Sequence, residues 1–144
     1  MRILVIDAHG GGVGKLLVSA LRKALPQAEL LAVGTNTTAT EAMHKAGATA
    51  AATGENAVVV GCRKAELIVG PMGIVIADSL NGEITPRMAL AVAQSDARKI
   101  LIPFHHCDTL VVGIADYNMA RLVQEAVECA KAACRPGETP GLDT

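Results

Sequence analysis

The stretch that decides the fold is residues 2–15, RILVIDAHGGGVGK. The apolar run over residues 2–7 predicts a strand, and four glycines within residues 8–14 predict a tight turn. Apolar residues then recur at helical spacing over residues 13–25, and Pro26 ends the predicted helix. A strand, a glycine turn and a helix in direct succession are typical of an α/β fold.

The glycine turn has the composition of an anion-binding loop. Without side chains, the backbone bends sharply and brings several N–H donors close to a phosphate or carboxylate. The N-terminus of the following helix adds a partial positive charge. We therefore expect the whole turn to hold a phosphate, through Gly10, Gly11, Gly12, Val13, Gly14 and Lys15. The alternative is that the glycines only allow the helix to pack closely on the sheet.

Known phosphate-binding motifs match this turn only in part. The dinucleotide motif G-x-G-x-x-G fails because Lys15 stands in place of its last glycine. The turn of short-chain dehydrogenases is matched by Gly12 and Gly14, with Ala8 in place of its first glycine. Residues 11–15, GGVGK, resemble the deviant P-loop of one class of ATPases, but Leu16 offers no hydroxyl to magnesium. The turn therefore favours phosphate binding over ATP turnover.

Strand and helix patterns alternate along the rest of the chain. Further strands are predicted at residues 29–34, 48–52, 67–70 and 99–103, and further helices at residues 38–46, 55–63, 86–95 and 119–134. Thr38 and Glu41 form a capping box for the second helix. Residues 109–113 follow the fifth strand too closely for a helical crossover, so they are predicted to fold back as an antiparallel edge strand.

This pattern predicts a three-layer Rossmann-like α/β sandwich with a mostly parallel sheet. Residues 1–134 are expected to form a single nucleotide-binding domain, and residues 135–144 a flexible tail. Ligands of such sheets lie beyond the carboxyl ends of the strands, where the strand order reverses. Six residues outside the glycine turn are expected at this rim: Thr35, Asn36, Glu55, Asn56, Gly70 and Gly73. Of these, Thr35, Asn36 and Asn56 are expected to contact the ribose or base.

Composition excludes several classes of partner. The net charge is −1 and the chain has one tyrosine and one phenylalanine, so it lacks the basic surface and stacking platform of a nucleic-acid-binding protein. No apolar run reaches membrane-spanning length. The chain begins inside the first strand, which leaves no room for a signal peptide and predicts a cytoplasmic protein. The hydrophobic fraction of 51% is high for a small soluble domain and predicts a homodimer.

The four cysteines form no CxxC pair, so free thiols and a reducing compartment are expected. The segment His105-His106-Cys107-Asp108 is the one place where metal ligands adjoin. In an extended chain His105 and Cys107 face the same side and His106 the other, which leaves too few ligands for a zinc site. We therefore expect no metal.

A series of short motifs adds a resemblance. In chain order they are GGGVGK, VGTN, TGEN, GPMG, DSLNGEITP and KILIP. This series is similar to an uncharacterised family of short bacterial Rossmann-like proteins, a domain of unknown function, over about residues 1–130. The resemblance implies a fold and no activity, and no catalytic residues carry over from it.

Three functions are compatible with these residues. A binding or sensor module for a nucleotide or dinucleotide, with an adenine nucleotide or NAD(P) as the ligand, is favoured by the glycine turn and the lack of a catalytic set. A small enzyme that acts on a phosphorylated metabolite or uses NAD(P) is supported by carboxylates at the rim, which are Glu55, Asp78 and Glu83. A scaffold that binds no ligand would be favoured if the chain's own side chains filled the rim.

Two features weaken the interpretation as a dehydrogenase. Tyr117 is followed four residues later by Arg121, whereas short-chain dehydrogenases have a lysine that can share a proton. The acidic residue that binds ribose at the end of the second strand is also missing, because Thr35 and Asn36 stand there.

Overall fold

The structure is a computed structural model, and it describes residues 1–103 and 109–134. In these residues the strands are β1 (Arg2–Asp7), β2 (Glu29–Gly34), β3 (Ala50–Thr53), β4 (Leu67–Pro71) and β5 (Arg98–Ile102). The helices are α1 (Gly12–Ala24), α2 (Thr37–Lys45), α3 (Glu55–Lys64), α4 (Pro86–Gln94) and α5 (Met119–Ala133), with a short 3₁₀ turn, η1 (Met72–Val75), after β4.

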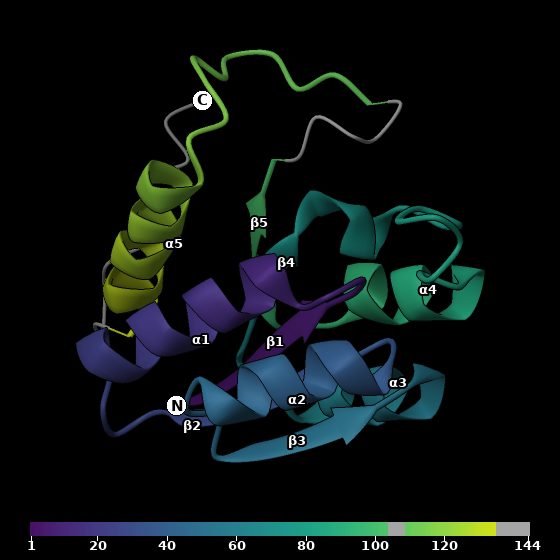
Figure 1. Ribbon diagram of the computed structural model, residues 1–144, viewed down its shortest axis with the longest axis horizontal. Helices are drawn as coiled ribbons and strands as arrows, with labels where there is room; N and C mark the ends of the chain where they lie inside the picture. Colours follow the sequence, from purple (N-terminus) through teal and green to yellow (C-terminus); the bar gives the residue numbers. More distant parts are fainter. Residues whose placement is uncertain (104–108, 135–144) are drawn as a thin grey trace.

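The strands form one sheet in the order β3-β2-β1-β4-β5, and every neighbouring pair is parallel. This is the strand order of the Rossmann fold, so the prediction of an α/β fold with a Rossmann-like sheet is confirmed. Helices α1, α2 and α5 cover one face of the sheet, and α3 and α4 cover the other (Figure 1).

The alternation of side chains along β1 explains the two layers of core. Ile3 and Val5 point to the face covered by α1 and α5, where they meet Leu17 and Val123. Leu4 and Ile6 point the other way, toward the buried side chains of α3 and α4. Because β1 is buried on both faces, its sequence is an unbroken apolar run until Asp7.

The predicted antiparallel edge strand is wrong. Residues 109–113 pair with no strand among the described residues, and every strand of the sheet is parallel to its neighbours. The segment runs along the outside of the molecule between β5 and α5 (Figure 1). Leu110 is 93% exposed and Val112 95% exposed, so these side chains pack against no described part of the molecule that would stabilise a strand.

The predicted start of the second helix is also wrong. Asn36, and not Thr38, is the N-cap of α2, and its Oδ1 accepts a hydrogen bond from Ala39 N at 2.9 Å. Asparagine is among the strongest N-caps, and here it precedes the predicted capping box by two residues. The N-cap of α4 is Thr85, whose Oγ1 accepts a hydrogen bond from Met88 N at 3.1 Å.

Candidate functional site

The strand order reverses between β1 and β4, which pair with each other at the centre of the sheet. Beyond their carboxyl ends lies a small cavity of about 160 Å³. The glycine turn, the end of β4 and the connection before α4 line it through Asp7, Ala8, His9, Gly12, Val13, Pro71 and Leu80. In Rossmann folds this position is where ligands bind.

The four glycines of the turn have two different reasons to be glycine. Gly11 has a φ of 73° and is the N-cap of α1, and a side chain at Gly14 would lie 2.5 Å from Met43 Sδ. A Cβ at Gly10 or Gly12 would meet no atom of a non-adjacent described residue within 4 Å. Packing and backbone conformation therefore explain why Gly11 and Gly14 are glycine, but they do not explain Gly10 and Gly12.

The first four amides of α1 differ in whether they have a hydrogen-bond acceptor. Gly14 N donates to Asp7 Oδ2 at 2.6 Å, and Lys15 N donates to Gly11 O at 2.8 Å. The amides of Gly12 and Val13 have no acceptor within residues 1–103 and 109–134. Since the positive end of the helix dipole lies here, these N–H groups are suited to an anion.

Asp7 is a buried carboxylate beneath the turn. Its side chain is 5% exposed, and its two oxygens accept from Gly14 N and from Ala8 N, the latter at 2.8 Å. Burial raises the pKa of Asp7, while the hydrogen bonds from Gly14 and Ala8 act against this rise. Asp7 was not predicted as a site residue, although its place directly after the apolar run of β1 indicates a buried carboxylate.

A second carboxylate, Glu83, lies across the rim of the site. Its Oε1 accepts from Thr35 Oγ1 and from Asn36 Nδ2, both at 2.8 Å. Its Oε2 accepts from His9 N at 3.1 Å and lies 3.2 Å from His9 Nε2. Partial burial alone would raise the pKa of Glu83, but the hydrogen bonds from Asn36, Thr35 and His9 outweigh it and lower the pKa.

Thr35 and Asn36 were predicted to contact the ribose or base of a ligand. The structure brings them to the rim, next to the glycine turn, but their side chains are engaged. Thr35 donates to Glu83, and Asn36 donates to Glu83 and to His9 O at 2.8 Å while it caps α2. A ligand that uses these donors has to share them with Glu83 or replace it.

The other predicted residues lie farther along the rim or inside the packing. Glu55 Oε2 accepts from Thr85 Oγ1 at 2.6 Å and so ties the start of α3 to the start of α4, while Asn56 is exposed beside it. Lys15 is exposed on the first turn of α1, where its charge is available to a phosphate.

Gly70 on β4 and Gly73 in η1 have packing reasons to be glycine. A Cβ at Gly70 would lie 2.5 Å from Ile6 O, and a Cβ at Gly73 would lie 3.0 Å from Leu80 Cγ. A role for Gly70 and Gly73 in ligand binding stays a prediction. The segment 105–108, discussed above for metal ligation, lies outside the described residues.

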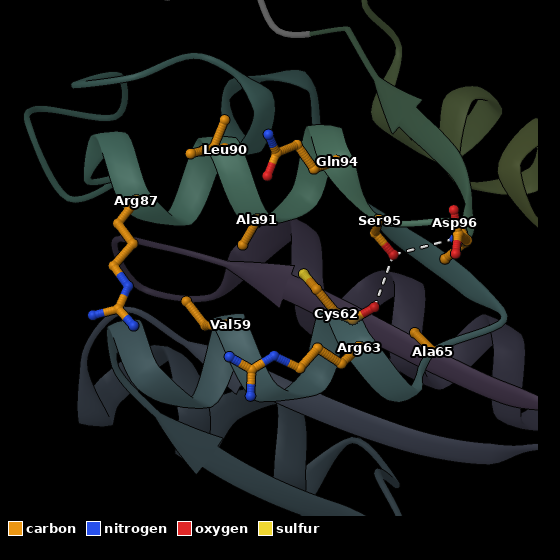
Figure 2. Close-up of a pocket in the computed structure, with 11 residues that line it drawn as sticks. Val59, Cys62, Arg63, Ala65, Arg87, Leu90, Ala91, Gln94, Ser95 and Asp96 are labelled. Carbon is orange, nitrogen blue, oxygen red and sulfur yellow. Dashed lines mark hydrogen bonds between the residues drawn. The ribbon is translucent and has the colours of Figure 1, made fainter.

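A larger groove, of about 520 Å³, opens between α3 and α4 (Figure 2). Its walls carry Val59, Arg63, Arg87 and Leu90, and its end is closed where Ser95 Oγ donates to Cys62 O at 2.8 Å. No residue of β1, β2 or the loops that follow them lines it. The groove is larger than the cavity at the strand reversal, and it is not built on the glycine turn.

Comparison with known proteins supports the resemblance seen in the motifs. The family model described as a domain of unknown function, DUF3842, matches residues 2–135. The chain belongs to the DUF3842 family. No curated protein is similar enough in sequence to match it. The DUF3842 assignment therefore brings a fold and no activity.

One solved structure gives a further comparison. It is the crystal structure of a dodecameric FMN-dependent Ubix-like decarboxylase from Escherichia coli O157:H7. The identity is 18% and the TM-score 0.48, and the match covers 89% of this DUF3842 chain and 75% of the decarboxylase chain. A likeness of this extent carries no conclusion about the ligand of the DUF3842 site.

None of the helices in residues 1–103 and 109–134 is both long and apolar enough to cross a membrane. Over the same residues, no three side chains of histidine, cysteine, aspartate or glutamate are grouped as metal ligands.

Proposed function

We propose that the protein binds an adenine nucleotide or dinucleotide, with its phosphate on the glycine turn. The observation that carries the proposal is a pair of amides, Gly12 N and Val13 N, which have no acceptor in the described part of the chain and lie at the positive end of α1 beside the cavity. The open space at Gly12 allows a phosphate to approach the backbone closely. The position at the reversal of strand order supports the same site.

The cavity is large enough for only part of such a ligand. At about 160 Å³ it is smaller than the roughly 300 Å³ at which pockets for whole small molecules begin. It therefore suits the phosphate, and the nucleoside lies along the rim toward Thr35 and Asn36. NAD(P) and adenine nucleotides share this adenosine and phosphate part, so the proposal covers both.

A valine at Gly12 is expected to abolish binding in a folded protein. Its side chain would fill the space through which the phosphate approaches, while the described residues outside its own turn place no atom within 4 Å of the new Cβ. Titration calorimetry with ADP and with NAD⁺ should show affinity reduced by at least about tenfold, or 1.4 kcal/mol.

The matched control for this experiment is Ser19→Val, which places the same side chain on the same helix two turns later, in the groove between α1 and α5. It is expected to bind like the wild type. Equal affinity of wild type and folded Gly12→Val would show that the site assignment is wrong.

An enzyme that acts on the bound phosphorylated ligand is the second candidate. It is supported by His9, whose ring is close to the Glu83 carboxylate, is 46% exposed and belongs to a residue that lines the cavity. A histidine oriented by a carboxylate is a common acid–base arrangement. Ligand turnover that disappears in His9→Gln while ligand binding persists would favour this candidate over a binding module.

We also propose that the protein is a homodimer, because several large apolar side chains are exposed on its surface. The most exposed are Leu110 and Val112 before α5, and Leu90 on α4, which is 54% exposed. A symmetric partner would remove such surface from water. Sedimentation equilibrium should give the dimer mass, and replacing Leu110 and Val112 together by aspartate should weaken the dimer by at least about tenfold. A single species at monomer mass, persisting at high concentration, would reject the dimer.

A further inference from the structure

The carboxylate of Glu83 lies at the end of β2, although the residues that directly follow this strand in the sequence carry no carboxylate. Rossmann dinucleotide-binding proteins use an acidic residue at this position to accept a hydrogen bond from the ribose 2′-hydroxyl. Here Thr35 and Asn36 follow β2, and both donate to Oε1 of Glu83 at 2.8 Å. Glu83 is 48 residues away from Thr35 in the chain and belongs to the connection between η1 and α4.

The same carboxylate also touches the glycine turn. Glu83 Oε2 accepts from His9 N at 3.1 Å, and His9 immediately precedes the turn's glycines. The carboxylate therefore lies between the amides that suit a phosphate and the end of the second strand. In a Rossmann site the ribose next to the pyrophosphate occupies this interval.

The connection before α4 is shaped to place this side chain. Asp78, Leu80, Asn81 and Gly82 all have φ between 55° and 81°, a left-handed conformation that residues other than glycine seldom adopt. The turn is held by the bond from Asp78 N to Ile84 O at 2.8 Å. Ile84 is fully buried under α4, so the backbone on the far side of Glu83 is fixed as well.

The two oxygens of the carboxylate differ in their partners. Oε1 accepts from Thr35, Asn36 and the amide of His9, whereas among the described residues Oε2 contacts His9 alone. The His9 ring is 46% exposed, and its Nε2 also lies 3.1 Å from Leu80 O, so it has a second acceptor when it leaves Oε2. The Glu83 side chain is 27% exposed, which leaves Oε2 accessible once the ring moves.

The charges around Glu83 disfavour a phosphate group on the 2′ oxygen of the ribose. Asp7 lies beneath the turn, and within the described parts of the chain no arginine contacts Thr35, Asn36 or Glu83. Proteins that accept a 2′-phosphorylated ribose place an arginine here. A carboxylate in its place repels the phosphate.

We propose that Glu83 is the ribose-binding carboxylate of this site and restricts its ligands to nucleotides whose adenosine ribose carries a free 2′-hydroxyl. The inference rests on the proposed nucleotide-binding function. The ribose hydroxyl donates to Oε2 and takes the place of the His9 ring, while Thr35 and Asn36 keep the carboxylate oriented.

Titration calorimetry with two ligand pairs tests this assignment. One pair is NAD⁺ and NADP⁺, and the other is ADP and its 2′-phosphorylated form. For each pair that binds, the wild type should prefer the member without the 2′-phosphate by at least about tenfold. In Glu83→Gln, the amide removes the charge and one acceptor oxygen, so affinity for the unphosphorylated member should fall and the preference should approach one. The preference is a ratio within one protein, so a general loss of stability does not mimic its change.

Glu66→Gln is the control, because this carboxylate accepts from Arg2 N at 2.7 Å at the opposite end of the sheet. It should leave the preference unchanged, and thermal unfolding should show that both variants are folded. A wild type that binds both members of a pair equally, or an unaltered preference in Glu83→Gln, overturns the inference while the proposed function stands. Tighter binding of both members by Glu83→Gln would also overturn it, since Glu83 would then only occupy the site. If none of the four ligands binds, the proposed function fails, and the inference fails with it.

Discussion

A valine in place of Gly70 is expected to unfold the domain or to destabilise it severely. Gly70 lies on β4 at the centre of the sheet, and a Cβ there would be 2.5 Å from the carbonyl oxygen of Ile6 on β1. The obstacle is backbone, so no side-chain rotation relieves it. Overpacking of this kind costs about 3 kcal/mol or more, which is a large part of the stability of a small domain.

Urea denaturation of Gly70→Val measures this cost. Gly10→Ala is the matched control, because no atom lies within 4 Å of the new Cβ and the glycine is not in a left-handed conformation. Its free energy of unfolding should stay within about 0.5 kcal/mol of the wild type. A folded Gly70→Val with wild-type stability would contradict the close approach of β4 to β1.

Removal of the Asp7 carboxylate is expected to have the second largest effect. Asp7→Ala deprives the buried amides of Gly14 and Ala8 of their acceptors, and these amides connect the end of β1 to the start of α1. Leaving two such donors unpaired should lower the free energy of unfolding by about 2–4 kcal/mol.

The effect of Asp7→Ala should also depend on pH. Burial raises the pKa of Asp7 in the native state, so the native protein holds this proton more tightly than the unfolded chain does. The stabilisation by Asp7 is therefore complete below its unfolded pKa of about 3.9 and falls as pH rises through the raised native pKa. When wild type and Asp7→Ala are denatured at pH values from 4 to 7, the difference between their free energies of unfolding should narrow as the pH rises. A difference that widens would mean that the hydrogen bonds from the amides, and not burial, dominate the pKa of Asp7.

The first unit of the fold follows from local sequence. The apolar run of β1, the glycine turn and the apolar stripe of α1 each depend on residues close together in the chain, so their patterns predict them well. The parallel order of the remaining strands follows because helices separate them. For the same reason the rim residues Thr35 and Asn36 were predicted next to the glycine turn.

Interactions between distant residues account for what the sequence did not reveal. Glu83 reaches Thr35 across 48 residues, and it does so through a turn whose left-handed residues include Leu80, which no pattern predicts to adopt that conformation. Residues 109–113 have strand-like composition, but whether an extended segment joins a sheet depends on a partner edge elsewhere in the molecule. The apolar run before Asp7 indicates a buried position, but the sequence does not indicate which amides donate to its carboxylate.

The amides of Gly12 and Val13 are the centre of the proposed site, and an NMR titration observes them directly. In ¹⁵N-labelled protein titrated with ADP, the account predicts that these two amide resonances shift most, and that they saturate together as the phosphate accepts their hydrogen bonds. Saturable shifts confined to the groove between α3 and α4, or an unchanged spectrum at millimolar ADP, would contradict phosphate binding at the glycine turn.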